Sequence, residues 1–344
     1  MSEAALPPPV SATATRSKFP LIGLAFLAAA LIALFYYKWG GALRAIQGVE
    51  ASGKLSVSPD GILKGGILLS TLHYFQRVWI ALAYGLVIGA VMRSLVSPRW
   101  IASLLGGRGA RPTVAGAVAG SPLMLCSCCV TPVFTGACER GAAMGPALSL
   151  MLASPGLNIA ALSLTFILMP LQFGVVRVVA AGVIVLGLAP LVGRVFGGDL
   201  KVSKVVGAED MPMDWKAIGV RFARSLGYMA VVTVPLILAG VLLSAWLLPR
   251  VLELPAGAGA LTVVLVALAA TMVALPTFFE IPIAFLLLQL GAPPGAAVAL
   301  LVAGPIVNLP SLFVLARETS ARVAASVGAG VFAIAVLAGL AASF

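Results

Sequence analysis

All four cysteines of this 344-residue chain lie within a short stretch, at positions 126, 128, 129 and 138. Three of them, Cys126, Cys128 and Cys129, belong to the run CSCCVTP inside an apolar segment. Thiol sulfur is a soft ligand that selects soft centres such as Cu(I) or zinc, and the same softness suits trivalent arsenic. Cysteine is also a common small buried residue, so packing is the alternative. We interpret these three residues as candidate ligands for a thiophilic solute and Cys138 as packing.

A short helix is predicted to begin directly after the cysteine run. Pro132 suits the first position of a helix, and the hydroxyl of Thr131 can cap the first amides. The positive end of that helix would then point at Cys128 and Cys129, where it favours negative charge. Ser127 and Thr131 could add oxygen atoms to the same solute site.

Glu280 is the acidic residue that lies deep in a predicted apolar segment, two residues before Pro282. A carboxylate inside a membrane is costly and is by default a functional hypothesis. It could be a proton-coupling group or a counter-charge for a cationic solute. The alternative is a structural salt bridge, with Arg93 or Arg177 as its partner.

Two asparagines each follow a proline inside a predicted long helix: Asn158 after Pro155 and Asn308 after Pro305. A proline within a helix frees one backbone carbonyl, which the asparagine side chain can satisfy. The asparagine can equally face a cavity, so both readings stay open. We include Asn158 and Asn308 among the candidate solute-binding residues, and we expect helix breaks at four prolines, Pro132, Pro155, Pro282 and Pro305.

The composition shows which elements must position these residues. The chain is 61% hydrophobic and 10% charged, far from the roughly 25% charged residues of soluble domains. Apolar runs long enough to cross a ~30 Å hydrocarbon core as helices predict an all-α polytopic membrane protein. The expected helices are 19–37, 67–96, 144–169, 174–196, 222–248, 295–316 and 322–343, with two segments, 113–140 and 259–290, that are broken in the middle.

The two halves of the chain carry the same pattern of glycine, proline and asparagine. Pro132, Gly141, Gly145, Pro155 and Asn158 recur 150 positions later, without a gap, as Pro282, Gly291, Gly295, Pro305 and Asn308. The cysteines do not recur. The match predicts an internal duplication, and it pairs the two broken segments with each other.

The distribution of Lys and Arg favours inverted repeats. If each broken segment is a re-entrant hairpin that turns near the midplane, most basic residues fall on the side of 1–18, 97–111, 194–221 and 317–322. That excess is expected on the cytoplasmic side, which places the N-terminus in the cytoplasm and the C-terminus on the opposite side of the membrane. Each half then crosses an odd number of times, so the second copy is upside down.

The predicted organisation follows from this topology. It comprises an N-terminal anchor helix with an external loop (1–66), a first transmembrane repeat (67–197), a cytoplasmic linker (198–220) and a second transmembrane repeat (221–344). Inverted repeats with broken helices point to a secondary-transporter site near the midplane, where the repeats meet.

Other classes of function fit the sequence poorly. The net charge of +11 comes from residues at the ends of apolar runs, which set topology and contact anionic lipid rather than nucleic acid. With His73 as the single histidine, a site built from several histidines is excluded. The chain has no H-E-x-x-H, P-loop or dinucleotide fingerprint. We therefore expect no enzyme activity, no cofactor and no resident metal, and leave homo-oligomerisation open.

The run 126–132, together with Gly141, Ser154-Pro155 and Asn158, resembles the predicted permease family that includes ArsP-like organoarsenical efflux permeases. Gly304-Pro305-Ile306-Val307-Asn308 in the second half fits the same family, and the resemblance covers roughly residues 67–343. It implies inner-membrane export of trivalent organoarsenicals bound by thiols. Cys129 stands where that family pattern has a glycine.

Together these features predict a permease that moves a small thiophilic solute, an organoarsenical or a soft metal or metalloid, by ion- or proton-coupled efflux. Uptake of a sulfur compound such as thiosulfate is one alternative. A membrane thiol-redox relay is another, and it would need thiols that a partner protein can reach. A structural scaffold is the third, and it predicts no phenotype when the cysteines are changed to serine.

Overall fold

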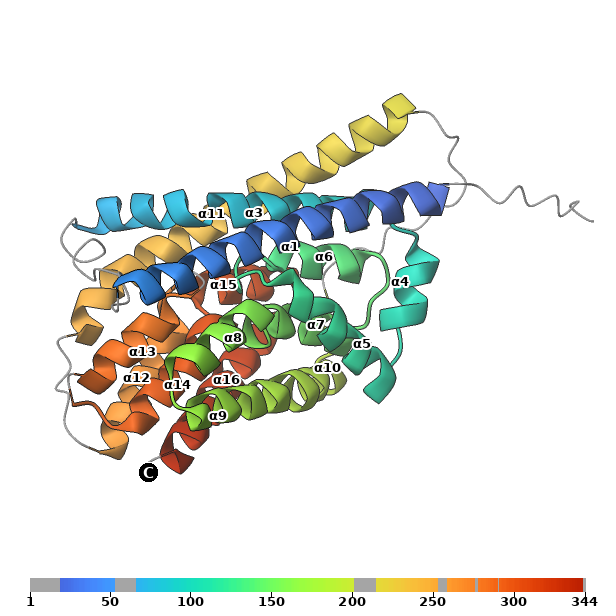
Figure 1. The fold of residues 1–344 in the computed structure, drawn as a ribbon. Coiled ribbons are helices and arrows are strands. Elements are labelled where there is room, and N and C mark those ends of the chain that lie inside the picture. Colours follow the sequence, from blue (N-terminus) through green and yellow to red (C-terminus); the bar gives the residue numbers. More distant parts are fainter. Residues whose placement is uncertain are drawn as a thin grey trace, which may run out of the picture.

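The computed structural model describes residues 19–52, 66–200, 215–252, 259–275, 278–289 and 291–342, and every regular element in these ranges is a helix (Figure 1). Five helical segments there are long and apolar enough to cross a membrane, and a pair bent by 41° adds a sixth if it is one span. Large apolar side chains such as Phe26, Val179 and Leu337 are exposed on the surface. The chain is therefore a multi-pass membrane protein.

The long helices are α1 (Phe19–Ser52), α3 (Gly66–Leu95), α11 (Trp215–Leu252) and α16 (Ala321–Ala341). The shorter helices of the first half are α4 (Pro98–Leu105), α5 (Ala110–Gly120), η1 (Ser121–Leu123), α6 (Thr131–Glu139), α7 (Met144–Gly156), α8 (Ile159–Leu168), α9 (Leu171–Val183), the π-helical η2 (Ile184–Leu188) and α10 (Ala189–Val195). Those of the second half are α12 (Ala260–Met272), α13 (Glu280–Gln289), α14 (Pro294–Ile306) and α15 (Leu309–Glu318).

Both segments that were predicted to break do so. Residues 124–130, which contain the three clustered cysteines, separate η1 from α6. In the second half α12 ends at Met272 and α13 begins at Glu280. The sequence prediction of interrupted helices in 113–140 and 259–290 is confirmed. The inverted orientation of the two halves stays a prediction, as do the domain limits. Of the predicted linker 198–220, residues 201–214 lie outside the described residues, and α11 already begins at Trp215.

The predicted helices 144–169 and 295–316 are each divided into two helices, so their prediction as single helices is wrong. The divisions follow directly after Pro155 and Pro305, where helix breaks were expected. Asn158 is the N-cap residue of α8, and its Oδ1 accepts a hydrogen bond from the amide of Ala161 at 3.1 Å. Asn308 is the N-cap residue of α15 and forms a capping box, in which its Oδ1 accepts a hydrogen bond from the amide of Ser311 at 3.1 Å. The upstream proline weakens the helix, and the asparagine gives the next one a strong start.

α1 is longer than the sequence suggested. The sequence predicted a helix over 19–37, but α1 continues to Ser52. Lys38 is only 6% exposed and lies against the rest of the bundle. The apolar run therefore ends inside α1, at a largely buried cation.

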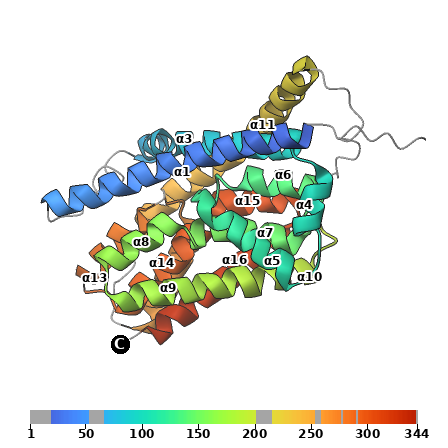
Figure 2. The ribbon, with the colours of Figure 1, turned by 45° about the vertical axis from the view of Figure 1, so that its right-hand side comes forward.

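The helices that hold the cysteine run form the middle of the bundle. α1, α3 and α11 lie along one side, α9 and α16 along the opposite side, and α6 and α7 between them (Figures 1 and 2). α3 packs on α1, α11 and α6, while α7 packs on α5 and α10. The loop that carries the cysteines is thus enclosed by helices from both halves of the chain.

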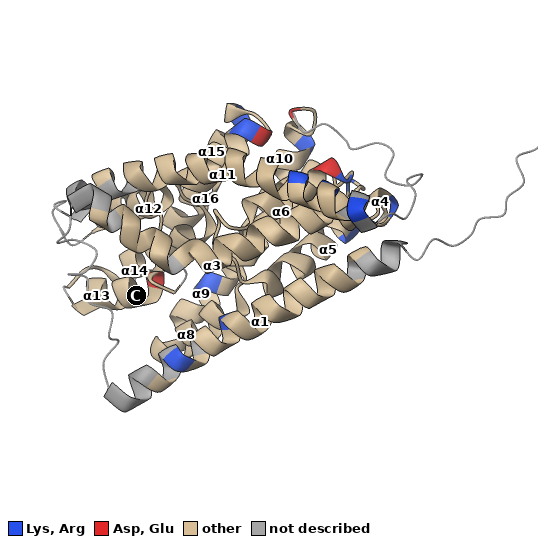
Figure 3. Ribbon diagram, turned by 90° about the horizontal axis from the view of Figure 1, so that it is seen from above, with Lys and Arg blue, Asp and Glu red and all other residues tan. Residues whose placement is uncertain are grey.

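Charged residues are rare along the helices and gather towards one end of the bundle, around α4, α10 and the last turn of α15 (Figure 3). We call this the charged end. There Arg93 Nε lies 2.6 Å from Glu139 Oε2, and the guanidinium of Arg140 donates to the backbone carbonyl of Arg93. Glu139 and Arg140 are both buried in this network.

Two glycines of α3 allow that helix to touch the cysteine run. A Cβ atom on Gly85 would overlap the carbonyl oxygen of Cys129, and one on Gly89 would lie 2.6 Å from the carbonyl oxygen of Pro132. Small residues at helix contacts in membranes permit such close approach. The approach fixes the position of the loop between η1 and α6.

We expect Gly85→Val to displace this loop, because the obstacle is backbone and cannot rotate away. Overpacking of this kind costs roughly 1–3 kcal/mol of unfolding free energy, which thermal unfolding in detergent would detect as a lower midpoint. Gly182→Val in α9 is the matched control, since a Cβ there meets nothing within 4 Å. Equal unfolding midpoints for the Gly85 variant and the wild type would contradict the packing described here.

Candidate functional site

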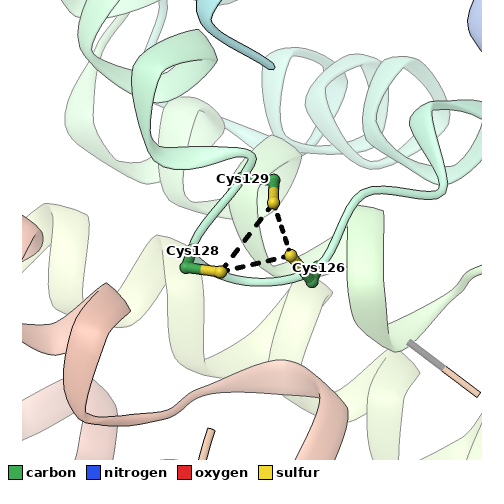
Figure 4. Close-up of side chains that lie close together, drawn as sticks. All are labelled: Cys126, Cys128 and Cys129. Atoms are coloured by element: carbon green, nitrogen blue, oxygen red, sulfur yellow. Dashed lines mark hydrogen bonds between the residues drawn. The ribbon is translucent and has the colours of Figure 1, made fainter. Parts of the chain in front are cut away.

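The three clustered thiols face one another within a single loop (Figure 4). Cys126 Sγ lies 2.7 Å from Cys129 Sγ and 3.2 Å from Cys128 Sγ, and the remaining Cys128–Cys129 distance is 3.8 Å. All three cysteines are free and buried. The structure thus brings together the three residues that the sequence analysis grouped as candidate ligands, and Cys126 is the member closest to both others.

Backbone hydrogen bonds fold the run into a tight turn ahead of α6. The carbonyl of Cys126 accepts from the amides of Cys129 at 3.0 Å and Val130 at 3.1 Å. Thr131 was expected to cap the new helix, and this is wrong: it is already the first residue of α6, and its Oγ1 donates to the carbonyl of Cys128 at 2.7 Å. Thr131 therefore holds the turn closed and does not offer its hydroxyl proton to a ligand.

The helix break after α7 is tied to the same loop. Ser154 Oγ accepts from the amide of Leu125 at 3.1 Å and lies 3.3 Å from that residue's carbonyl oxygen, to which it can donate. This serine precedes Pro155 and stands one turn before the break at Asn158. The end of α7 thus anchors the start of the cysteine run.

The two interrupted segments meet beside the cysteines. Each contains a non-glycine residue in the left-handed region, Met124 with φ +50° and Phe278 with φ +78°. Phe278 and Trp39 of α1 pack against the buried pair Met124 and Ala160. Backbone strain of this kind costs energy and persists where the surroundings enforce it, often at functional sites. The first loop, the α7–α8 break, the second loop and α1 therefore converge on one place.

The sequence reasoning missed two polar residues in this region. Tyr74 of α3 places its hydroxyl oxygen 3.4 Å from Cys128 Sγ. Lys38 of α1 is 6% exposed, and Trp39 beside it packs against Met124, two residues before Cys126. A lone cation in an apolar helix is a signal that could have identified Lys38, whereas nothing in the sequence separates Tyr74 from an interfacial tyrosine.

Two side-chain donors in this region have no partner. Ser127 Oγ and Asn158 Nδ2 are fully buried and make no hydrogen bond within the described part of the chain. Buried polar groups almost always have a hydrogen-bond partner. A bound ligand would supply the partner that these two donors lack. Asn308 also caps a helix with its Oδ1, as Asn158 does, but its Nδ2 is not one of the unpartnered buried atoms of the described residues.

Glu280 is paired with Arg177, one of the two partners considered from the sequence. Arg177 Nη2 lies 2.9 Å from Glu280 Oε1, and Arg177 Nη1 donates to Thr165 Oγ1 at 2.7 Å. Both charged side chains are almost fully buried. The pair joins α9 in the first half to α13 in the second. In the described residues Glu280 makes no hydrogen bond to the three thiols.

Cys138 is separate from the cluster. It lies at the far end of α6, where it lines a cavity at the charged end of the bundle. α6 has nine residues, so this thiol is about 10 Å along the helix from the cysteine run at a rise of ~1.5 Å per residue. The sequence reading, which set Cys138 apart from the other three, agrees with this position.

The arrangement of the three sulfur atoms suits a soft ion or a thiophilic atom. All three lie within 4.8 Å of one another. Around a zinc-like ion with bonds of about 2.3 Å, tetrahedral sulfur ligands are about 3.8 Å apart, so a small opening of the triangle would fit one. Because all three sulfur ligands belong to one tight turn, they can bind such an ion without any rearrangement of the helices.

The sequence of this chain is similar to those of known proteins. A family model described as "Predicted permease" (ArsP_1) matches residues 65–344. The UPF0718 protein YraQ of Escherichia coli (strain K12) is 30% identical over 322 residues, which cover 91% of this chain and 92% of that protein. The UPF0718 protein MJ0584 of Methanocaldococcus jannaschii is 28% identical over 123 residues, 34% of this chain and 33% of that protein. No solved structure matches significantly. The chain belongs to this family of predicted permeases.

Proposed function

We propose that the protein moves a small thiophilic solute, such as an organoarsenical or a soft metal or metalloid, across the bacterial inner membrane by way of the cysteine run, with Cys126, Cys128 and Cys129 as its soft ligands. The observation that carries the proposal is the mutual contact of three buried thiols in a loop that interrupts the helices. Irregular backbone at membrane depth is tolerated where it is buried in protein or lines a cavity. The unpartnered Ser127 and Asn158 support a solute at the same place.

The burial of the thiols favours transport over a redox relay. A relay must present its thiols to a partner protein, and all three are at most 5% exposed. A gated transport site, in contrast, exposes its ligands only in turn to each side. We therefore assign the site to binding and release of a solute and not to an enzyme reaction.

Glu280 is proposed as the coupling acid. Its pairing with Arg177 across the two halves means that a proton on Glu280 would neutralise one partner and free the other. Interactions that differ between two conformations are what couple an ion to transport. The proposed direction is efflux, with the N-terminus in the cytoplasm. The inverted repeat, which would put the site at the interface of the halves, is part of this proposal.

The test is growth of a bacterial host that expresses either the wild-type chain or a Cys126→Ser/Cys128→Ser/Cys129→Ser variant at equal levels. The media would contain trivalent methylarsenite, arsenite, copper or mercury, or thiosulfate as the sulfur source. Protection by the wild type that the triple variant lacks would establish thiol-dependent efflux and identify the solute. Cys138→Ser is the matched control, and we expect it to protect like the wild type.

Other outcomes discriminate among the alternatives. Greater sensitivity with the wild type, or rescue on thiosulfate, would reverse the direction to uptake. Equal growth of the wild type, the triple variant and cells without the protein in every medium would overturn the proposal. In that case the cysteines would be packing residues.

A further inference from the structure

Polar residues other than the cysteines also lie in the region of the cysteine run. Lys38 of α1 is 6% exposed. The neighbouring Trp39 packs against Met124, which precedes the cysteines, and against Ala160, which follows the α7–α8 break. Ser127 lies within the run, and Asn158 stands between Ser154, which bonds the loop, and Ala160. One cation and two unpartnered donors therefore lie on the elements that meet at the cysteine loop.

The charge in this region is positive. In the described part of the chain Lys38 has no ion pair, and the buried acid Glu280 is neutralised by Arg177. A cation in a largely buried, apolar position attracts a negative group, because charges interact more strongly there than in water. Serine hydroxyl and asparagine amide groups are the donors that oxygen anions use.

A cavity at the charged end of the bundle is also lined by positively charged residues. It has a volume of ≈350 Å³, is open to solvent, and is lined by Arg108, Arg194, Thr113 and Cys138 together with several glycines. Neither arginine has a carboxylate within 4.0 Å among the described residues, whereas Arg93 and Arg177 are paired. α6 runs from this cavity to the cysteine run. Clefts lined by one sign of charge raise the local concentration of the opposite sign.

We propose that the solute is a thiophile that also carries an anionic oxygen group, an oxyanion or a carboxylate, and that Lys38, Ser127 and Asn158 bind this group while the three cysteines bind the soft atom. The inference rests on the proposed function and narrows its substrate class. It excludes a bare metal cation as the preferred solute, because such an ion would meet Lys38 beside its sulfur ligands and two unpaired arginines at the mouth of the cavity.

The test measures thiol modification of purified protein in a Cys138→Ser background, where only the cluster can react. The probes are two methanethiosulfonate reagents of similar size, one with a sulfonate and one with a trimethylammonium group, and each rate is divided by the rate with a free small thiol. At low ionic strength we expect the anionic reagent to be favoured by about tenfold, since focused fields raise local ion concentrations by roughly 10-fold or more. Lys38→Gln should bring the ratio close to one, and Lys38→Arg should keep it.

A second arm uses the cavity. With Cys126, Cys128 and Cys129 changed to serine, Cys138 is the remaining thiol, and Ala143→Cys adds a more exposed reporter in the lining. Preference for the anionic reagent at either thiol should disappear in Arg108→Gln/Arg194→Gln and in high salt.

The results separate the two proposals. A ratio near one, or a preference for the cation, at the cluster of the protein with Lys38 intact would overturn the inference, and so would a ratio that Lys38→Gln leaves unchanged. A third, neutral reagent, methyl methanethiosulfonate, tests access to the cluster. If it failed to modify the cluster, the inference would be overturned too, because the site would then admit no solute. None of these readings depends on transport, so a protein that shows the anionic preference but confers no thiol-dependent phenotype would contradict only the proposed function.

Discussion

Cys126→Ser is expected to weaken binding of Cu(I) or Cd²⁺, used here as soft probes of the thiols, by more than about 100-fold, because even loss of a second-shell partner costs 10–100-fold at metal sites. Cys126 is the thiol closest to both others, at 2.7 and 3.2 Å. Its loss therefore leaves two sulfur atoms 3.8 Å apart with a hard oxygen beside them. Serine has nearly the same shape as cysteine, so the fold should be retained.

The measurement is a competition titration of purified protein with a chromophoric chelator, with thiolate-to-metal absorption as a second signal. Tyr74→Phe should lower affinity by about tenfold, in line with the 10–100-fold effect of outer-shell partners, since its hydroxyl contacts Cys128 Sγ. Cys138→Ser is the matched control and should bind like the wild type. If the Cys138 variant lost binding while the Cys126 variant kept it, the assignment of the site would be wrong.

The site was predictable from the sequence to the extent that its residues are adjacent in the chain. Three cysteines in four positions ahead of Thr131-Pro132 must lie close together whatever surrounds them, and the prolines marked the interruptions of the helices. The pairing of Glu280 with a basic residue was also foreseen as an alternative, because a buried carboxylate needs a partner. These conclusions depend on local geometry and on the cost of burying charge.

The rest depends on tertiary packing that a single sequence does not reveal. Tyr74 contacts Cys128 from α3, and nothing in its own part of the sequence marked it. Lys38 of α1 could have been noticed as a lone cation in an apolar helix, but the sequence does not show that α1 packs beside the cysteine loop. The roles of Asn158 and Asn308 were left open because an asparagine after a proline can cap a helix or face a cavity, and the structure shows that both cap the next helix. Thr131 was misjudged by one position, since α6 starts at this residue and not after it.

Arg177→Met is expected to have the largest effect on stability. Removing one partner of a buried ion pair leaves the other charge without compensation and costs about 3–5 kcal/mol of unfolding free energy. Arg177 and Glu280 are both nearly inaccessible, and Arg177 also bonds Thr165. We therefore expect a large drop in the unfolding midpoint, measured by denaturation in detergent. Arg194→Met, at an exposed arginine of α10, is the control and should change the midpoint little.

The double variant Arg177→Met/Glu280→Gln distinguishes two causes of this loss of unfolding free energy, an unpaired carboxylate and lost packing. Replacement of a whole buried pair by neutral residues is often close to neutral, so the double variant should recover most of the loss. Such recovery means that the single variant suffers from an unpaired carboxylate and not from lost packing. The same reasoning applies to a proton on Glu280, which would remove the attraction between α9 and α13 and free Arg177. If the double variant were as unstable as Arg177→Met, the pair would be a packing element, and protonation of Glu280 could not drive a change between the halves.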